Sequence, residues 1–336
     1  MTQSSFEFDA PPPAPPPAAP ATSRTKRAPA PPPPALTAEA MAQQLEQDPD
    51  FRVLRRLVPT NDFGPAPAAP EVRHVLVLDT ETTGLSHQVD KIIELAMLLV
   101  QVDANTGVPF GPVDVLEGFE DPGMPIPPVA TEVTGINDAM VQGHRLDDEQ
   151  VAAMVARADL IVAHNAGFDR PFVEARFPIF ATKAWACSFA DIDWKAAGAG
   201  SSKLSALAQD HGWFYDAHRA QVDCHALLQV LARPVPKATT TGLAQLIAAA
   251  DSPSFKLRAT GSPFESKDVL KARGYRWDAE AKVWFCTLAD AQRLEDELAW
   301  LKAEVYGRRS ARVDIEALDS GVRYSARPGT LTQQSL

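Results

Sequence analysis

The pattern of apolar and polar positions predicts a first folded region over residues 71–236. Short, almost wholly apolar runs at 74–78 and 159–163 predict buried strands, and further strands are expected at 91–100 and 113–119. Apolar positions at helical spacing predict helices, which we place at 146–157, 170–176, 203–211 and 219–231. Strands first, then alternating strand and helix, are typical of an α/β sheet domain.

A second, smaller region is expected over residues 255–327. Its pattern predicts a strand at 255–260, a helix at 265–273, a hairpin through Trp277 and 283–287, and a helix at 290–304. Two strands should flank a turn at 319–321. Residues 237–254 are expected to form a linker that contains a helix at 243–250, and residues 328–336 a tail. The second region is therefore a small α+β module.

The start of the chain is rich in proline. Residues 11–35 hold 12 prolines among 25 positions, a composition that cannot bury a core, so we expect residues 1–36 to be a disordered, extended tail. Over 37–70 we expect two short helices, at 37–47 and 48–57, and then a linker rich in proline and alanine.

Composition narrows the class of protein. No apolar run approaches the roughly 18 residues of a membrane span, and the polar start has no signal-peptide core. The three cysteines follow no metal-ligand spacing, which favours a reduced, cytoplasmic protein with no membrane contact. The net charge is −11, but residues 252–336 carry 14 Lys and Arg against 12 Asp and Glu. The C-terminal region would therefore repel a phosphate backbone least.

Candidate chemistry begins where the first buried strand ends. Asp79 and Glu81 follow the apolar run 74–78, and residues two apart on an extended chain point to the same side. Two carboxylates held this close repel each other, so a cation is the natural reason for the arrangement. Hard oxygen ligands suit Mg²⁺ or Mn²⁺.

Two more segments deliver groups of the same kind. Asp169 lies just past the apolar run 159–163, at a helix start, and His218 stands at the entrance to a helix that carries Asp223 in its first turns. Each acid alone reads as a solvated surface residue, and His218 alone as a helix cap. Four carboxylates and one histidine from three segments are better explained by one site.

These motifs resemble those of the DEDDh exonucleases, a family that includes the epsilon proofreading subunit of bacterial DNA polymerase, ribonuclease T and oligoribonuclease. The similarity covers roughly 73–233. It rests on the strings Asp-Thr-Glu-Thr-Thr-Gly-Leu from Asp79, His-Asn-Ala-Gly-Phe-Asp ending at Asp169, and His-Arg-Ala-Gln-Val-Asp-Cys-His-Ala-Leu from His218. The resemblance implies a ribonuclease H-like fold, a mixed sheet flanked by helices.

The resemblance also implies a mechanism. Asp79, Glu81, Asp169 and Asp223 would hold two metal ions, Mg²⁺ or Mn²⁺, about 4 Å apart. His218 would act as general base toward the attacking water. The backbone around Thr80, Thr82, Gly135 and Ile136 would hold the terminal nucleotide. No small organic cofactor is implied.

The small module carries aromatic residues interleaved with cations, an arrangement that can stack bases and meet phosphates. It resembles a module of conjugative primases and, more loosely, the HARP domain of annealing helicases. The cations expected to contact nucleic acid are Lys267, Lys271, Arg273 and Arg276. The alternative is that Trp277, Trp284 and Phe285 simply form the core of a small domain.

Three functions remain open on the sequence. The first is a 3′–5′ exonuclease that releases nucleoside monophosphates from single-stranded DNA, in repair or proofreading. The second is a 3′–5′ exoribonuclease, and the third a non-catalytic nucleic-acid-binding protein on the same fold. The intact acids and His218 count against the third, and the appended module favours DNA over RNA. Protein partners are not indicated.

Overall fold

The computed structural model describes residues 36–307 and 309–336, so most of the expected tail at 1–36 lies outside the described residues. The described part of the first compact unit, which ends at Phe51, holds helix α1 (Ala38–Leu45). The Thr37 hydroxyl accepts a hydrogen bond from the backbone of Ala40 and so begins the helix. No residue of α1 is buried.

The helix expected at 48–57 is a wrong prediction. The chain turns at 46–50 and then forms the short strand β1 (Arg55–Arg56), which pairs in parallel with β7 (Trp213–Phe214). Backbone hydrogen bonds from Arg55 to Gly212 and from Leu57 to Phe214 hold this pairing. Leu57 is buried in the main core, so tertiary burial has overridden the local helix signal.

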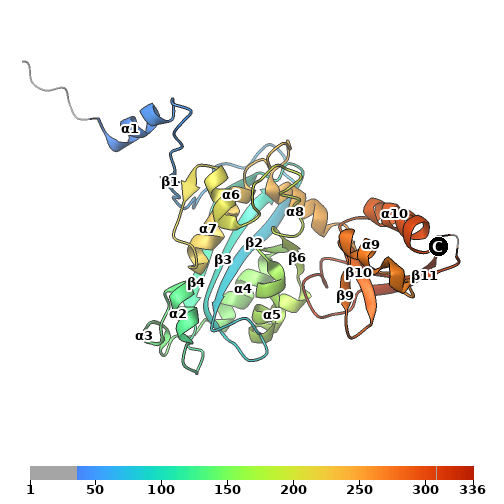
Figure 1. The fold of residues 1–336 in the computed structure, drawn as a ribbon. Helices are drawn as coiled ribbons and strands as arrows, with labels where there is room; N and C mark the ends of the chain where they lie inside the picture. Colours follow the sequence, from blue (N-terminus) through green and yellow to red (C-terminus); the bar gives the residue numbers. More distant parts are fainter. Residues whose placement is uncertain (1–35, 308) are drawn as a thin grey trace, which may run out of the picture. The chain divides into compact units, whose positions relative to one another are not determined.

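A five-stranded mixed sheet organises the second unit, in the order β4-β3-β2-β5-β6 (Figure 1). The three long strands are antiparallel, whereas β5 and β6 run parallel to β2. The strands are β2 (Val72–Thr82), β3 (Ile92–Asp103), β4 (Pro109–Phe119), β5 (Leu160–Ala163) and β6 (Ala184–Cys187). This arrangement confirms the mixed sheet flanked by helices.

Each face of this sheet is covered by helices, and side-chain alternation along β2 explains why. Val75 and Val77 belong to the core that includes the helices after β6, whereas Leu76 and Leu78 point into the opposite core. The first face is covered by α6 (Leu204–Asp210), α7 (Ala220–Leu231) and α8 (Gly242–Ala250). The second is covered by α4 (Asp148–Arg157), α5 (Ala166–Arg176) and the 3-10 turn Pro178–Thr182.

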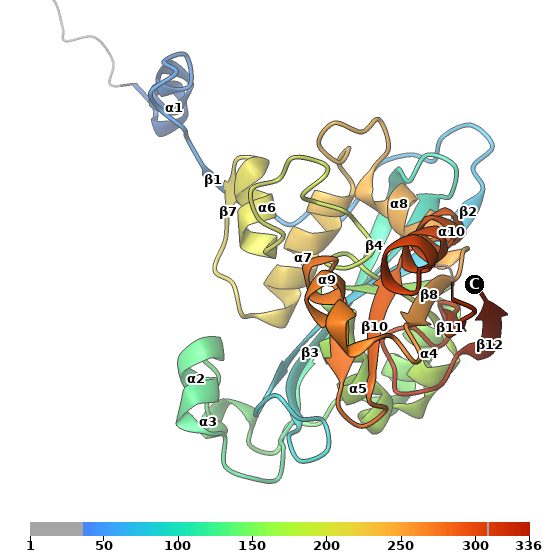
Figure 2. The same ribbon diagram turned by 45° about the vertical axis from the view of Figure 1, so that its right-hand side comes forward.

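Two short helices stand apart from these layers. Helices α2 (Pro128–Thr134) and α3 (Asp138–Val141) pack on their own small apolar cluster, which includes Ile93, Ile126 and Ile136. Figure 2 shows them together, away from the helices of the two faces.

The C-terminal region forms a separate five-stranded sheet in the order β12-β11-β8-β10-β9, in which all neighbours are antiparallel. Its helices pack on one face around Leu257, Leu270 and Leu298 (Figure 2). The strands are β8 (Ser254–Arg258), β9 (Arg276–Asp278), β10 (Val283–Leu288), β11 (Arg312–Leu318) and β12 (Thr330–Ser335). The helical parts are the 3-10 turn Phe264–Ser266, α9 (Lys267–Ala272), α10 (Ala291–Trp300) and the π-helical turn Leu301–Val305.

Two expected boundaries differ from the structure. Residues 330–335, expected in a tail, form β12 and pair with β11 along its length. The expected linker contains α8, and Leu243 and Leu246 of that helix are fully buried in the core of the larger domain. A polar, exposed strand such as β12 gives no apolar signal, so its pairing could not be seen in the pattern.

The segment 319–327 between β11 and β12 packs on the larger domain. The Trp185 amide of β6 donates to the carbonyl of Ser320 at 2.9 Å, and the guanidinium of Arg170, which is fully buried, donates to the carbonyl of Gly321 at 2.5 Å. Tyr324 donates its hydroxyl to Asp191 at 2.5 Å. The C-terminal region is therefore tied to α5 and β6 through one of its own loops.

No helix within residues 36–307 and 309–336 has the length and apolar character needed to cross a membrane.

Candidate active site

Asp79 and Glu81 come from the last part of β2, where both are still paired with β3. The pairing shifts register between Glu81 and Thr82, directly after the acids. Ligand oxygens of Asp79, Glu81 and Asp223 all lie within 4.8 Å of one another. The structure therefore brings together three of the four predicted acids as one possible set of ligands.

Asp169 stands in the first turn of α5 and is almost fully buried, at 2% exposure. Its Oδ1 accepts hydrogen bonds from the Thr80 amide at 3.1 Å and from the Thr80 hydroxyl at 2.8 Å. Thr80 lies between Asp79 and Glu81, so this pair of bonds ties α5 to the end of β2. The fourth acid is thus fixed beside the other three.

His218 and Asp223 are linked through the backbone at the start of α7. Asp223 Oδ2 accepts from the amides of His218 at 2.8 Å and of Arg219 at 3.2 Å, and its Oδ1 accepts from the Tyr215 hydroxyl at 3.1 Å. His218 has φ of 68°, a left-handed conformation that is strained for a residue other than glycine. The Asp223 carboxylate holds that turn in place and leaves the His218 side chain exposed.

Sequence reasoning missed an ion pair at this turn, between the buried Glu94 and the exposed Arg219. Glu94, 5% exposed, stands opposite Glu81 on β3. Its carboxylate accepts from the guanidinium of Arg219 at 2.8 Å and from the Ala220 amide at 2.9 Å. Glu94 therefore fixes the residue that follows His218. A glutamate inside the apolar run 91–100 was the one available signal.

The acids hold their protons more tightly than usual. Burial, followed by the charges of Asp169 and Asp223, raises the pKa of Asp79 well above its ordinary value. Burial and the charge of Asp223 raise the pKa of Glu81 to about 8, and burial raises the pKa of Asp169 to about 7. The pKa of Asp223 is also raised by burial, although its hydrogen bonds oppose the shift. Such a cluster gains most from a cation that neutralises it.

The donor set fits a divalent ion of the hard type. Asp79, Glu81, Asp169 and Asp223 offer only carboxylate oxygens, which Mg²⁺ and Mn²⁺ prefer, and among the described residues no cysteine takes part. Burial, together with the repulsion among the acids, raises the pKa values of Asp79 and Glu81, and a bound cation would offset both effects.

All five predicted catalytic residues line one open cleft of about 780 Å³. The lining also includes Thr80, Tyr215, Ala217, His164, Asn165, Phe168, Phe189, Lys203, Leu204 and Ser205. Like His218, Asn165 is held at positive φ, here 75°.

The residues predicted to hold the terminal nucleotide are only partly brought to this cleft. Thr80 lines it, whereas Thr82, Gly135 and Ile136 do not. The Gly135 amide donates to Thr131 at 2.8 Å and the Ile136 amide to the Thr134 hydroxyl at 3.1 Å, so both amides have partners within or next to α2. Their role toward a nucleotide stays a prediction.

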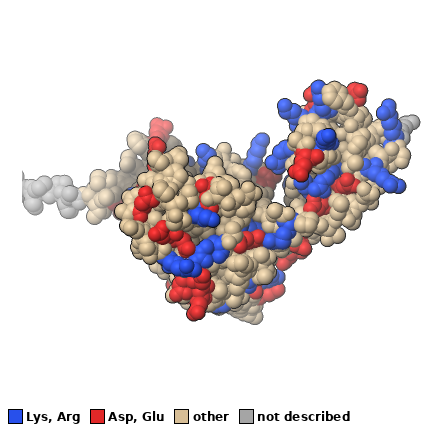
Figure 3. Space-filling view, turned by 90° about the horizontal axis from the view of Figure 1, so that it is seen from below, with Lys and Arg blue, Asp and Glu red and all other residues tan. Residues whose placement is uncertain are grey.

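The predicted cations of the C-terminal module differ in their surroundings. Lys267 stands over the ring of Phe264, which is 77% exposed, and Arg276 over the ring of Phe285. Arg273 is instead engaged by Glu297 at 3.0 Å and stacks on Trp300. On the face drawn in Figure 3, lysine and arginine side chains are frequent over this module.

Comparison with known proteins finds similarity in the part of the chain that carries the acids. Residues 76–231 match the family model described as "Exonuclease". Curated relatives include the PolC-type DNA polymerase III of Caldanaerobacter subterraneus, 36% identical over 103 residues, and that of Halalkalibacterium halodurans, 41% identical over 106 residues. Each match covers 30% of this chain and 7% of the relative. The chain thus spans a small fraction of the length of these relatives.

Among solved structures, exonuclease X in complex with 5′ overhanging duplex DNA aligns with 51% of this chain and 99% of that chain, at 24% identity and a TM-score of 0.38.

Proposed function

We propose that the protein hydrolyses DNA from the 3′ end and releases nucleoside monophosphates one at a time, because residues 76–231 match the exonuclease family model and carry motifs that resemble those of the DEDDh exonucleases. Single-stranded DNA is the proposed substrate, and repair or proofreading the proposed setting. The observation that carries the proposal is the joint placement of Asp79, Glu81, Asp169, Asp223 and His218 on one cleft.

The acids would hold the metal, proposed as two Mg²⁺ or Mn²⁺ ions. Bound there, the metal supplies charge neutralisation at the phosphate and a more acidic water. The chain's own contribution is orientation. Thr80 aims the carboxylate of Asp169, and Tyr215 together with the turn at His218 aims that of Asp223. These bonds leave other carboxylate oxygens of the cluster to act as ligands.

His218 is the proposed general base. Its side chain lies on the cleft that holds the acids, and it projects from a turn fixed on both sides, by Asp223 through its own amide and by Glu94 through Arg219. Histidine is the side chain that most often takes a proton from water in general base catalysis. The imidazole can then pass that proton to solvent, because His218 is exposed.

DNA is the proposed substrate class for two reasons. The relatives that match this domain bear the name DNA polymerase III, although the match covers 7% of their length. The C-terminal module adds exposed aromatic and cationic side chains, Phe264 with Lys267 among them, which suit single-stranded nucleic acid. Lys267, Lys271 and Arg276 are the proposed contacts. Arg273, given its bonds to Glu297, is proposed to act mainly by positioning α9.

A competition assay tests the substrate class. Purified protein is given equal amounts of single-stranded DNA and RNA of identical sequence, each 5′-labelled with a different dye, first with Mg²⁺ and then with Mn²⁺. We expect the DNA to shorten faster. Faster shortening of the RNA would replace the proposal with an exoribonuclease, and shortening of neither strand by folded protein would favour a non-catalytic binding protein.

A further inference from the structure

Helix α5, which carries Asp169 in its first turn, begins with little local support. Its N-cap residue Asn165 has φ of 75° and makes no side-chain capping bond to the helix. Pro171, inside the helix, has no amide proton, so the carbonyl of Gly167 in the first turn lacks its usual helical donor. The position of Asp169 therefore depends on contacts that α5 makes with other parts of the chain.

One such contact comes from segment 319–327, between β11 and β12. Arg170, the residue directly after Asp169, is fully buried. Its guanidinium donates hydrogen bonds to three carbonyls of the segment, those of Ser320, Gly321 and Arg323. A loop of the C-terminal module thus holds α5 at the position next to a proposed metal ligand.

A second contact reaches α5 from its N-terminal end. Tyr324 donates a hydrogen bond from its hydroxyl to Asp191 Oδ1 at 2.5 Å, and Asp191 Oδ2 accepts from the Cys187 amide at 2.8 Å. The sulfur of Cys187 accepts from the amide of Ala166, the first residue of α5, at 3.3 Å. Three hydrogen bonds in series therefore run from segment 319–327 to the residue at which α5 begins.

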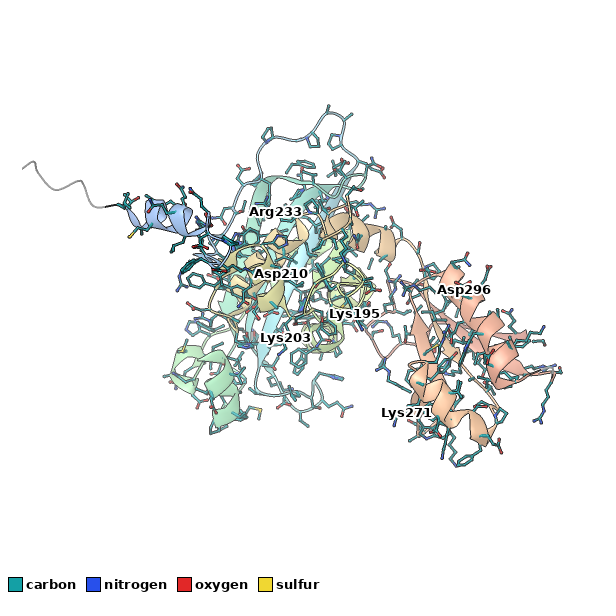
Figure 4. All side chains as sticks on the ribbon, turned by 45° about the horizontal axis from the view of Figure 1, so that its top comes forward. Lys195, Lys203, Asp210, Arg233, Lys271 and Asp296 are labelled. Atoms are coloured by element: carbon teal, nitrogen blue, oxygen red, sulfur yellow. The ribbon has the colours of Figure 1, made fainter. Side chains whose placement is uncertain are left out.

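The helical part of the C-terminal module meets the larger domain at the surface. Figure 4 labels Lys271 and Asp296, which lie on α9 and α10. Helix α10 reaches the larger domain through Arg293, whose ion pair with Asp193 at 3.8 Å is exposed on both sides. An exposed pair of this kind adds little to stability, whereas the side chain of Arg170 has no exposed surface. The buried connection to α5 is therefore made by segment 319–327.

We propose that segment 319–327 is a positioning element of the active site, which sets where the Asp169 carboxylate stands relative to the other three acids. Tyr324 and Arg170 act as positioning residues, one through Asp191 and β6 and the other through α5 itself. The inference rests on the proposed function, in which Asp169 binds metal. The C-terminal module then contributes to metal binding as well as to contact with DNA.

The test is calorimetric titration of the full-length protein with Mn²⁺ in the absence of substrate, with circular dichroism to verify the fold of each variant. Tyr324→Phe removes one hydroxyl and should raise the dissociation constant for Mn²⁺ by about 10-fold, the lower end of the range for groups that orient metal ligands. Asp191→Ala breaks the same series of bonds at its next member and should raise the constant at least as much. Tyr306→Phe is the matched control, because the buried Tyr306 donates to the carbonyl of Thr260 within the module, and it should leave the constant unchanged. An unchanged constant in folded Tyr324→Phe or Asp191→Ala, or an equal rise in Tyr306→Phe, would overturn the inference.

The route through Asp169 is tested by the same titration in the Asp169→Asn background. Ligand atoms of Asp79, Glu81 and Asp223 lie within 4.8 Å of one another without any contribution from Asp169, so this variant should still bind one ion. Adding Tyr324→Phe should then leave the dissociation constant unchanged. A further rise of about 10-fold would mean that the segment acts on the whole cluster, and would overturn the inference. Absence of Mn²⁺ binding by folded wild type would instead remove the proposed metal site, and the exonuclease function with it.

Discussion

Replacement of the buried Arg170 should lower the free energy of unfolding strongly. Its side chain is fully buried, and the guanidinium donates to Glu174 Oε1 at 2.6 Å and to the carbonyls of Ser320, Gly321 and Arg323. Glu174 in turn pairs with Arg327 at 2.7 Å. Replacement by methionine keeps most of the volume and removes every one of the Arg170 bonds.

The size of the loss in stability follows from the polar groups that remain when the Arg170 guanidinium is removed. Glu174 keeps Arg327, but the three carbonyls lose a charged donor in a place that water does not reach freely. Breaking a buried pair by removing one partner costs about 3–5 kcal/mol. Because Glu174 retains a partner, we expect the lower end, about 3 kcal/mol, which in a unit that spans Arg52–Leu336 corresponds to a fall in Tm of roughly 5 °C.

The assay is urea unfolding of the full-length Arg170→Met variant, followed by tryptophan fluorescence, since Trp185 packs on the Arg170 guanidinium. Arg145→Met is the control: that arginine is mostly exposed and pairs with Asp148 on the surface, so its loss should leave the free energy of unfolding nearly unchanged. A loss for Arg170→Met no larger than for Arg145→Met would refute the view that segment 319–327 is an integral part of the larger domain.

Three further predictions concern the site. Glu94→Gln should lower kcat by about 10–100-fold without unfolding the protein, because the turn that carries His218 loses its ion pair. Steady-state kinetics measures kcat, and circular dichroism checks the fold. An unchanged kcat would contradict the role of Glu94 in positioning His218. His218→Ala should slow the chemical step by about 10²–10⁴-fold with little change in Mn²⁺ affinity, as read by single-turnover kinetics and metal titration; a wild-type rate would remove it as general base. The raised pKa values of Glu81, about 8, and Asp169, about 7, mean that the folded state binds protons that the unfolded state has released. In chelator, stability should therefore fall as pH rises from about 5 to 8, and Mn²⁺ should restore more of it at the higher pH; a melting temperature that is flat in this window for wild type, or equally pH-dependent in Asp79→Asn, would contradict this.

The central sheet and the acids were accessible to sequence reasoning for a physical reason. A strand buried on both faces must be apolar throughout, so β2 and β5 stand out, and acids placed at their ends break that pattern visibly. Asp79, Glu81 and Asp169 were found in this way. His218 and Asp223 were placed at the start of the helix that the apolar pattern predicts over 219–231, and the order of the motifs along the chain supported their grouping with the other acids.

The contacts that support the site were not accessible, because they join positions far apart in the sequence. Glu94 sits within an apolar run and gives no hint that its partner is Arg219, 125 residues later. Arg170 lies in a predicted helix, and nothing in the sequence indicates that it is buried and bonded to carbonyls about 150 residues away. Tyr215 lies outside every motif, and only the fold brings its hydroxyl to Asp223. Polar partners at such distances leave no local periodicity.

The central claim, a metal-dependent hydrolysis that starts at the 3′ end and uses the four acids, is tested most directly by the order in which labels are released. One single-stranded DNA is labelled at its 5′ end and an identical one within its 3′-terminal nucleotide, and both are incubated with wild type or Asp79→Asn, with Mn²⁺ or with chelator. We predict that wild type with Mn²⁺ releases the 3′ label at once as a mononucleotide and the 5′ label last, and that chelator or Asp79→Asn abolishes both. Release of the 5′ label first, or undiminished release by Asp79→Asn or in chelator, would contradict the account.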